Sequence, residues 1–479
     1  ITFLHFITTY LCNSKQSDMY IEQLYTGCLA EAAYYIESDG EAAIIDPLRE
    51  TEPYLKMAEE RGAQIKYVFE THFHADFVSG HVDLAKKTGA KIVYGPTAKT
   101  SYDIIEANDG EIFELGKIKI KLLHTPGHTP ESSCYLLHDE DGKAHSIYTG
   151  DTLFIGDVGR PDLAQKNGTM TPEDMAGTLY DSLREKIMPL PDHIVLYPGH
   201  GAGSACGKNM SDETTALLGD QKQTNYALGD ISKEDFIKEL TTGILPPPQY
   251  FPKAAMQNKQ GYKSIDDIYS SSTEMSVEMV QKAIADGALV VDTRHEHDFE
   301  AGHVPGSWFF GLDGNFAPWA GALITDLHQP LVLITEAGRE DEATMRLARV
   351  GFDNVLGYLG GGIESWENAG NDLRTVKSIT PDQFVNAKPE GQTVDVRLPS
   401  EYDTCHVNGA ELVPLDFIHS EYLKLDMNRD YLLHCKGGYR SVIFWSIMAS
   451  KGYSHLTNIR GGFDALKEAG ADVVMPELA

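Results

Sequence analysis

An internal repeat in the second half of the chain, with a period of about one hundred residues, constrains the fold most strongly. Three short motifs occur twice and in the same order: 291–294 and 394–397, 302–306 and 405–409, and the glycine pairs 361–362 and 461–462. In each copy, buried-strand patterns alternate with helical patterns, which is typical of a small α/β domain with a largely parallel sheet. The second half therefore predicts two copies of one α/β fold.

The first half of the chain, from Met19, has a different pattern of short strands separated by turns and helices. Strands are predicted at 42–45, 65–70, 91–94, 118–123, 134–137, 147–149 and 193–197, and helices at 53–61 and 172–186. Three prolines at 246–248 break the pattern, because proline continues neither a helix nor a strand interior. We therefore expect three domains: a β-rich domain at 19–262 and two α/β copies at 263–375 and 376–479.

The composition excludes some partners and favours a cytoplasmic enzyme. The net charge of −31 repels phosphate backbones and anionic lipid surfaces, so we expect neither nucleic acid nor a membrane as a partner. Six cysteines in 479 residues do not form a disulfide framework, which favours a reducing compartment. The apolar stretch at 1–11 is too short to span a bilayer and lacks the features of a signal peptide. We expect residues 1–18 to be an upstream extension or an expression artefact.

Four separated segments of the first half each carry a histidine or an aspartate close to the end of a predicted strand. The residues are His72, His74 and Asp76 in the first segment, then His128, Asp151 and His200. The last three follow a glycine directly, and glycine lets the backbone turn sharply so that side chains from different strands converge. Any one of these residues alone would more often be structural, but the ordered set predicts a metal site.

This set resembles the metallo-β-lactamase superfamily, whose H-x-H-x-D-H signature is followed by a later His, Asp and His in the same order. The resemblance covers about residues 20–255 and implies a four-layer αβ/βα sandwich with the metal between its two sheets. One position departs from the signature, because Phe77 stands where its last histidine is expected. In dinuclear members such as hydroxyacylglutathione hydrolase, that histidine helps to hold a second metal. Phenylalanine has no lone pair to donate, so we expect one metal.

Among mononuclear relatives, the chain resembles the persulfide dioxygenase branch. That resemblance implies one Fe(II) held by His72, His128 and Asp151, a two-histidine, one-carboxylate facial triad with open positions for O₂ and a substrate sulfur. It also implies that His74, Asp76 and His200 orient these ligands without binding the metal. Whether His74 itself binds the metal stays open.

Two further residues near this set have two interpretations each. Arg160 matches an arginine of the dioxygenase pattern, and its guanidinium is expected either to hold a substrate carboxylate or a loop around the site, or to form a structural ion pair. Cys206 lies six residues after His200, and it either carries a persulfide near the iron or is a buried inert thiol. We treat both as candidate substrate-binding residues.

The second copy of the repeat contains a nucleophile motif. A predicted strand at 431–434 runs into Cys435, Lys436, two glycines, Tyr439 and Arg440, and a helical pattern follows. A strand, a glycine-rich loop and a helix start form a nest of backbone N–H groups, which together with Lys436 and Arg440 is expected to lower the pKa of the Cys435 thiol. The alternative is a buried cysteine before a glycine turn.

This loop resembles the active-site loop of the rhodanese family of sulfurtransferases, whose C-x-x-x-x-R motif spans Cys435 to Arg440. The resemblance implies a persulfide on Cys435 as the carried intermediate, with Lys436 and Arg440 as catalytic neighbours. The first copy lacks this chemistry, because Thr335 stands where the cysteine is expected and Glu336 places acid in the nest. We expect the first copy to be an inactive rhodanese-like module that serves docking, spacing or dimerisation.

The whole order of domains resembles the persulfide dioxygenase–sulfurtransferase fusions of bacterial sulfide detoxification. The resemblance implies the reaction RSSH + O₂ + H₂O → RSH + sulfite, and sulfane-sulfur transfer that forms or uses thiosulfate. The expected partners are therefore a small thiol persulfide, O₂, sulfite and thiosulfate, and a homo-oligomer is compatible with the sequence. Two alternatives stay open: a zinc-dependent thioesterase of the hydroxyacylglutathione hydrolase type, and a non-catalytic sulfur carrier or sensor.

Overall fold

The computed structural model describes residues 19–163 and 170–475, so the expectation for residues 1–18 lies outside the described part. The front of the chain forms two six-stranded sheets, each with mixed parallel and antiparallel pairs. The first sheet contains β1 (Met19–Thr26), β2 (Glu31–Ser38), β3 (Glu41–Ile45), β4 (Gln64–Phe69), β5 (Lys91–Tyr94) and β6 (Ile105–Glu106) in that order. The second contains β12 (Ala216–Leu217), β11 (Val195–Pro198), β10 (Ala144–Gly150), β9 (Ser133–His138), β8 (Ile118–His124) and β7 (Ile112–Leu115).

Alternating side chains of the strands build three apolar layers. In β2, Tyr34 packs between the two sheets with Phe69 and Tyr135, whereas Tyr35 faces the opposite side and packs with Tyr54 of a covering helix. This alternation follows from the two-residue period of a strand, and it buries both faces of the sheet. The covering helices include α1 (Glu52–Arg61) and α2 (His81–Thr88) on the first sheet, and α3 (Pro172–Ser182) and α5 (Lys233–Thr241) on the second. The expected four-layer αβ/βα sandwich is confirmed.

The connection to the second half is more regular than the proline run suggested. After the prolines come α6 (Phe251–Gln260) and α7 (Ile265–Ser271), two helices that the sequence pattern did not predict. Asn258 in α6 binds back to the front sandwich, because its Nδ2 donates to the carbonyl oxygens of His74 and Phe77. Helix α6 therefore remains attached to the front sandwich, whereas α7 packs against Met345 and Ala348 of the first copy. The short helix α4 (Leu218–Thr224) completes this half.

The predicted repeat is confirmed as two parallel five-stranded sheets with the same strand order. The first sheet runs β13 (Thr273–Met275), β17 (Val355–Leu359), β16 (Leu331–Ile334), β14 (Leu289–Asp292) and β15 (Trp308–Phe309). The second runs β18 (Ser378–Ile379), β23 (Leu456–Ile459), β22 (Tyr431–His434), β19 (Gln392–Asp395) and β21 (Glu411–Leu412). A separate pair joins β20 (His406–Val407) to β24 (Val473–Val474).

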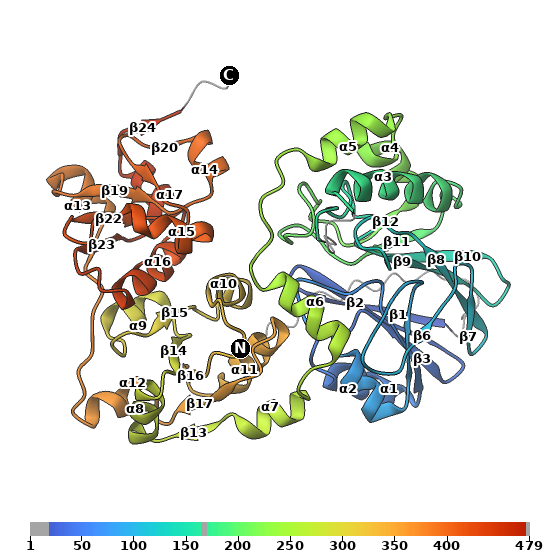
Figure 1. Ribbon diagram of the computed structural model, residues 1–479, viewed down its shortest axis with the longest axis horizontal. Helices are drawn as coiled ribbons and strands as arrows, with labels where there is room; N and C mark the ends of the chain where they lie inside the picture. The colour runs from blue at the N-terminus through green and yellow to red at the C-terminus, as the bar shows by residue number, and fades with distance from the viewer. Residues whose placement is uncertain (1–18, 164–169, 476–479) are drawn as a thin grey trace.

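Helices flank both sheets, and Figure 1 shows the two copies beside the front sandwich, the first copy in yellow and orange and the second in red. The first copy contains α8 (Val277–Ala285), α9 (Glu296–Ala301), α10 (Phe316–Leu323), α11 (Glu340–Arg349) and α12 (Gly362–Asn368). The second contains α13 (Pro381–Ala387), α14 (Pro399–Thr404), α15 (Ile418–Glu421), α16 (Tyr439–Ser450) and α17 (Gly462–Glu468).

The repeated Val-Asp-x-Arg motif has the same structural role in both copies. Arg294 forms a two-point ion pair with Asp292, and Arg397 does the same with Asp395. Each arginine also donates to the backbone oxygen eight residues later, that of Gly302 or Cys405. Both pairs are buried, and the carbonyl satisfies part of the remaining guanidinium. The motif is therefore structural in both copies. Within the described residues, no helix is long and apolar enough to cross a bilayer.

Candidate metal centre and sulfur-transfer loop

His72, His128 and Asp151 converge at the strand ends of the front sandwich. One ligand atom from each lies within 4.8 Å of the other two. The Nε2 atoms of His128 and His72 lie 3.4 and 3.8 Å from Asp151 Oδ2. All three side chains are buried, and both Nε2 atoms and both carboxylate oxygens lack a hydrogen-bond partner. Buried polar atoms are costly to leave unpaired, so this group fits a metal ion.

The other nitrogen of each histidine ring is fixed by a neighbour. His128 Nδ1 donates to the carbonyl oxygen of Arg160 at 2.8 Å. His72 Nδ1 lies 2.9 Å from Thr71 Oγ1, which itself donates to Asp46 Oδ2 at 2.8 Å, so the ring is the donor in the first contact. With Nδ1 protonated, each neutral ring presents the lone pair of Nε2 toward Asp151. Both rings are therefore set up as metal ligands, and burial lowers the pKa of His72, which keeps it neutral.

Two glycines bring the segments together as the sequence predicted. Gly150, which ends β10, has φ +47°, and a Cβ there would lie 2.3 Å from Thr71 Oγ1. A Cβ on Gly199 would lie 2.8 Å from Asp151 Oδ1. Any larger residue at these positions would push apart the strand ends that carry Asp151 and His72.

His74 lies beside this group but has carboxylate partners of its own. Its Nε2 is 3.0 Å from Asp46 Oδ1 and 3.7 Å from Glu70 Oε2, and its ring centroid is 4.2 Å from that of His72. Burial alone would lower the pKa of His74, but the two carboxylates raise it to about 9. A histidine held in an ion pair with Asp46 is suited to orient the site, and whether it binds the metal stays a prediction.

Asp76 and His200 form the far side of the centre. His200 Nε2 lies 3.3 Å from Asp76 Oδ2 and 3.4 Å from Asp151 Oδ1, and its Nδ1 donates to the carbonyl of Ala30 at 3.2 Å. The Phe77 side chain is fully buried in an apolar cluster, and its ring centroid is 4.3 Å from that of His74. The position where the signature expects another histidine therefore offers an aromatic face instead of a lone pair.

The two candidate substrate residues lie on the loops that close the centre. The Arg160 guanidinium donates to both carboxylate oxygens of Asp162 and to the carbonyls of Ala205 and Leu245. It thus ties loops around the site, and contact with substrate stays a prediction. The Cys206 thiol is buried within 4.8 Å of ligand atoms of Asp151 and His200, and burial raises its pKa. Its role as a persulfide carrier also stays a prediction.

The second site lies at the strand–loop–helix junction between β22 and α16. Cys435 is the first residue after the strand, and its Sγ accepts a hydrogen bond from the backbone N–H of Gly438 at 3.1 Å. Lys436 is exposed at the loop surface. Arg440 forms a two-point ion pair with Glu401 of α14, at 2.7 and 2.8 Å. The loop therefore holds the thiol against a backbone donor, beside a cation that Glu401 keeps in place.

The corresponding loop of the first copy is built differently. Thr335 follows β16, and Arg339 comes four residues later instead of five. The Arg339 guanidinium pairs with Asp313 and Glu342, and Glu340 begins the following helix. A threonine hydroxyl forms no persulfide, and the arginine at the helix start is bound by two carboxylates from within the first copy. The geometry agrees with the expected inactive copy.

Three residues that support these sites are absent from the sequence-based set. Asp46 directly follows β3, and a strand running into an aspartate is the same signal that marked the other site residues. Asn258 and Glu401 gave no such signal, because each lies on a helix far along the chain from the loop it holds. Their roles follow from tertiary contacts alone.

Comparisons with known proteins agree with this geometry. Residues 26–200 match the Metallo-beta-lactamase superfamily, and residues 276–369 and 380–469 match the Rhodanese-like domain. The chain is 31% identical to the mitochondrial persulfide dioxygenase ETHE1 of Homo sapiens over 221 residues, which is 46% of this chain and 78% of that protein. It is 30% identical to the hydroxyacylglutathione hydrolase GloC of Haemophilus influenzae over 194 residues, 36% of this chain and 85% of that protein.

Among solved structures, a metallo-beta-lactamase from Staphylococcus aureus subsp. aureus COL superimposes with a TM-score of 0.63 and 34% sequence identity. The match covers 71% of this chain and 99% of that one, so it extends beyond the front sandwich.

Proposed function

This chain is an enzyme that belongs to the metallo-β-lactamase superfamily and ends in two rhodanese-like domains, and from that membership we propose that it oxidises a small thiol persulfide with Fe(II) and transfers sulfane sulfur through Cys435. The proposed reaction of the front domain is RSSH + O₂ + H₂O → RSH + sulfite. The tail then exchanges sulfur between a Cys435 persulfide and sulfite or thiosulfate. Detoxification of sulfide is the biological role that we infer.

One observation carries the proposal for the front domain. Two histidines and one carboxylate present unpartnered atoms to one point, while Phe77 stands at the sequence position of the signature's last histidine. Two imidazoles and a carboxylate with open positions suit non-haem iron. The 31% sequence identity to the human persulfide dioxygenase supports the same chemistry.

The metal ligands and Arg160 have different proposed roles in the front domain. His72, His128 and Asp151 would hold Fe(II), which when bound supplies the redox chemistry that O₂ requires. Arg160 orients one of these ligands through its carbonyl and keeps the surrounding loops closed over the buried centre.

In the tail, Cys435 is the proposed nucleophile. Its thiolate attacks the outer sulfur of a donor persulfide, the S–S bond to the donor breaks, and the donor leaves as a thiolate. Sulfite then attacks the outer sulfur on Cys435, forms the S–S bond of thiosulfate and releases the Cys435 thiolate. The N–H of Gly438 stabilises negative charge on the Cys435 sulfur in both steps.

Paired variants test the two halves separately. We expect Asp151→Ala to lose iron and at least a hundredfold of persulfide-dependent oxygen uptake, while thiosulfate-to-thiol sulfur transfer persists. The exposed Asp141→Ala is the matched control. We expect Cys435→Ser to lose sulfur transfer and keep oxygen uptake, with Cys405→Ala of the same domain as its control. Full oxygen uptake by Asp151→Ala, or unchanged sulfur transfer by Cys435→Ser, would show that these residues are misassigned.

The hydrolase alternative is favoured by one contact. His74 lies against His72, with ring centroids 4.2 Å apart. His72, His74 and His128 could together hold one zinc, and the 30% identity to GloC agrees with this alternative. A zinc-loaded protein that cleaves S-lactoylglutathione and takes up no oxygen with persulfide would support this function. Phe77 and the Cys435 loop favour the dioxygenase.

The remaining assignments follow from the same reasoning. We propose domain boundaries of 19–262, 263–375 and 376–479, which fall between α6 and α7 and just before β18. We also propose a cytoplasmic setting, in line with the five described cysteines, all of which are free thiols. The proposed substrates are thiol persulfide, O₂, sulfite and thiosulfate, and neither nucleic acid nor a membrane is a proposed partner.

A further inference from the structure

Tyr439 belongs to the Cys435 loop, but its side chain is held by the other rhodanese-like copy. Its hydroxyl donates to the carbonyl oxygen of Gly311 at 2.8 Å, and burial raises its pKa, so the donor stays protonated. Its ring packs edge-on against Phe309, with centroids 5.5 Å apart. A Cβ on Gly314 would lie 2.5 Å from the ring. Phe309, Gly311 and Gly314 of the first copy thus form a socket for Tyr439.

The socket is one residue away from the group that holds the reactive sulfur. The N–H that donates to Cys435 Sγ belongs to Gly438, which has φ +109°. Glycine rotates more freely than any other residue, so this peptide needs an outside restraint to keep its N–H aimed at sulfur. The side chain of Tyr439, anchored in the socket, provides that restraint on the C-terminal side of Gly438.

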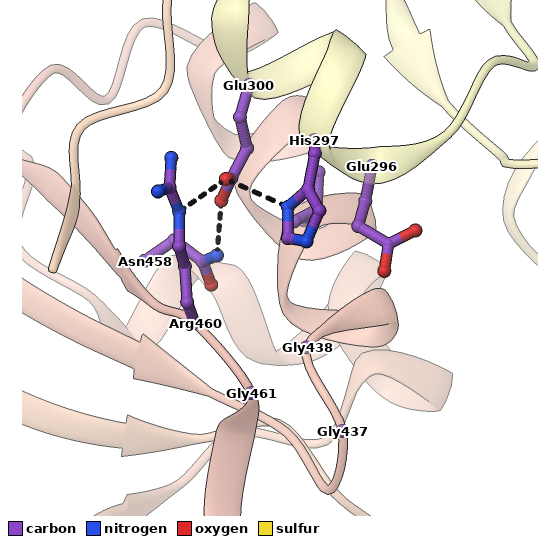
Figure 2. A pocket seen from close by; sticks show the side chains of 9 residues that line it. Glu296, His297, Glu300, Gly437, Gly438, Asn458, Arg460 and Gly461 are labelled. Atoms are coloured by element: carbon purple, nitrogen blue, oxygen red, sulfur yellow. Dashed lines mark hydrogen bonds and ion pairs between the residues drawn. The ribbon is translucent and has the colours of Figure 1, made fainter. Parts of the chain in front are cut away.

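Glu300 of the first copy also holds the segment that packs against the Cys435 loop. The buried carboxylate of Glu300 in α9 accepts from Asn458 Nδ2 at 2.7 Å and from Arg460 Nε at 2.8 Å. These residues lead into the turn at Gly461, and the N–H of Phe463 just beyond it donates to the carbonyl of Cys435. Figure 2 shows Glu300 facing both side chains, with Gly437, Gly438 and Gly461 below them.

The same helix also forms part of a pocket beside the loop. Glu296, His297 and Glu300 of α9 line it from the first copy, and Gly437 and Gly438 line it from the second. The pocket has a volume of about 100 Å³, and the loop that carries the nucleophile forms one of its walls. The first copy therefore contributes both restraint and surface next to Cys435.

We propose that Tyr439 is a positioning residue for sulfur transfer, and that the catalytically silent copy completes the Cys435 site by holding Tyr439 in its socket. The inference rests on the proposed role of Cys435 as the sulfur carrier. It gives the inactive copy a function, because the socket adds a restraint from the first copy to the backbone beside the Gly438 N–H, which the Ser441 hydroxyl also holds through the Gly438 carbonyl.

The test uses the full-length chain and three variants. Tyr439→Phe removes the hydroxyl that binds Gly311, and Gly314→Ala fills the socket. Ser450→Ala is the matched control, because it removes another hydrogen bond between the copies, from Trp308 Nε1, in the last turn of α16. Two readouts are measured: the pH profile of Cys435 alkylation by iodoacetamide, followed by mass spectrometry, and the kcat and KM of thiosulfate-to-glutathione transfer.

We expect Tyr439→Phe to shift the alkylation profile to higher pH and to lower kcat by about three- to tenfold, the loss of one hydrogen bond, with a smaller change in KM. Gly314→Ala should have the larger effect, and Ser450→Ala should match the wild type. Alkylation and kcat of Tyr439→Phe equal to those of Ser450→Ala would overturn the inference. A wild type without sulfur transfer would overturn the proposed function instead, while the alkylation profiles would still decide the role of Tyr439.

Discussion

At the residue scale, Phe77 is the residue on which the proposal of a one-metal centre rests. Its neighbours Asp76 and His200 still face each other at 3.3 Å, so two of the side chains that a second metal would use remain. His74 lies close to both, with one ligand atom of each residue within 4.8 Å of the others. What the chain lacks is the last histidine of the signature, because the fully buried Phe77 stands at that sequence position.

We expect Phe77→His to raise the metal content from one toward two per chain, because an imidazole supplies the missing lone pair. Metal analysis after dialysis against Fe(II) or Zn²⁺ measures this ratio. Phe77→Leu is the matched control, since it changes the apolar packing without adding a donor. An unchanged ratio in Phe77→His would contradict the explanation based on position 77.

A second residue, His303 of the first rhodanese-like copy, is expected to make the stability of the folded protein depend on pH. The ring is buried, stacks on Phe299 and donates from Nδ1 to the Phe299 carbonyl. Burial lowers the pKa of His303 to about 4, although the carbonyl opposes this, whereas an unfolded histidine titrates near 6.5. Between these values the unfolded chain binds the extra proton, so this contribution to stability is complete above pH 6.5 and is lost as the pH falls toward 4.

We expect the thermal midpoint of the wild type to fall between pH 6.5 and 4.5 more steeply than that of His303→Gln. The difference corresponds to at most about 1.4 kcal/mol of unfolding free energy per pH unit. His455→Gln, which changes a half-exposed histidine, is the control and should follow the wild type. Parallel curves for wild type and His303→Gln would show that the buried His303 ring is not the source of this pH dependence.

At the element scale, the two strand–loop–helix units differ at the positions on which the proposed activity of the second copy depends. In the second copy the helix begins with Tyr439 and Arg440, and in the first it begins with Glu340. Arg339 lies in the silent loop but is bound to Asp313 and Glu342. Restoring the nucleophile alone would therefore leave a loop that is one residue shorter before its arginine and that contains Glu336.

We expect Thr335→Cys, introduced into Cys435→Ser, to show no thiosulfate-to-glutathione sulfur transfer. The new thiol would face Glu336 and Glu340 instead of Lys436 and Arg440. The single variant Cys435→Ser is the background control. Recovery of even a few per cent of wild-type transfer would show that the identity of residue 335 alone silences the first copy.

Elements were predictable where a local signal marked them. Hydrophobic periodicity and turn residues in the sequence marked the repeat, the strands at 91–94 and 431–434, and the helix at 53–61. The structure places these elements within a residue or two of the predicted bounds. The helix predicted at 172–186 divides into α3 and a π-helical turn, Leu183–Ile187, a change that periodicity does not reveal. The socket for Tyr439 and the role of Asn258 depend on contacts between distant segments, so no local pattern contains them.

At the scale of the whole molecule, the first copy packs against the front sandwich as well as against the second copy. Arg349 at the end of α11 pairs with Glu50, and Arg49 pairs with Asp353 at 3.0 Å. Both arginines are largely buried, and a buried charge that loses its partner is strongly destabilising, so these pairs disfavour other arrangements of the two domains. One apolar cluster includes residues of all three domains, among them Phe77 and Cys435.

This arrangement places two sulfur chemistries in one molecule. In the proposed function, sulfite made in the front domain would be a substrate for Cys435, and tethering would raise its local concentration without any new contact. The proposed persulfide and sulfite substrates are both anions, whereas the chain carries a net charge of −31. Positive side chains near the two sites must therefore attract them locally. We therefore expect coupled products rather than sulfite alone.

The most direct test of the proposed function is oxygen uptake by the iron-loaded protein on addition of glutathione persulfide, with sulfite and thiosulfate assayed afterwards. We predict oxygen uptake with sulfite formation, and thiosulfate that disappears in Cys435→Ser. Absence of oxygen uptake, together with bound zinc and cleavage of a glutathione thioester, would contradict the proposed function and make the front domain a hydrolase.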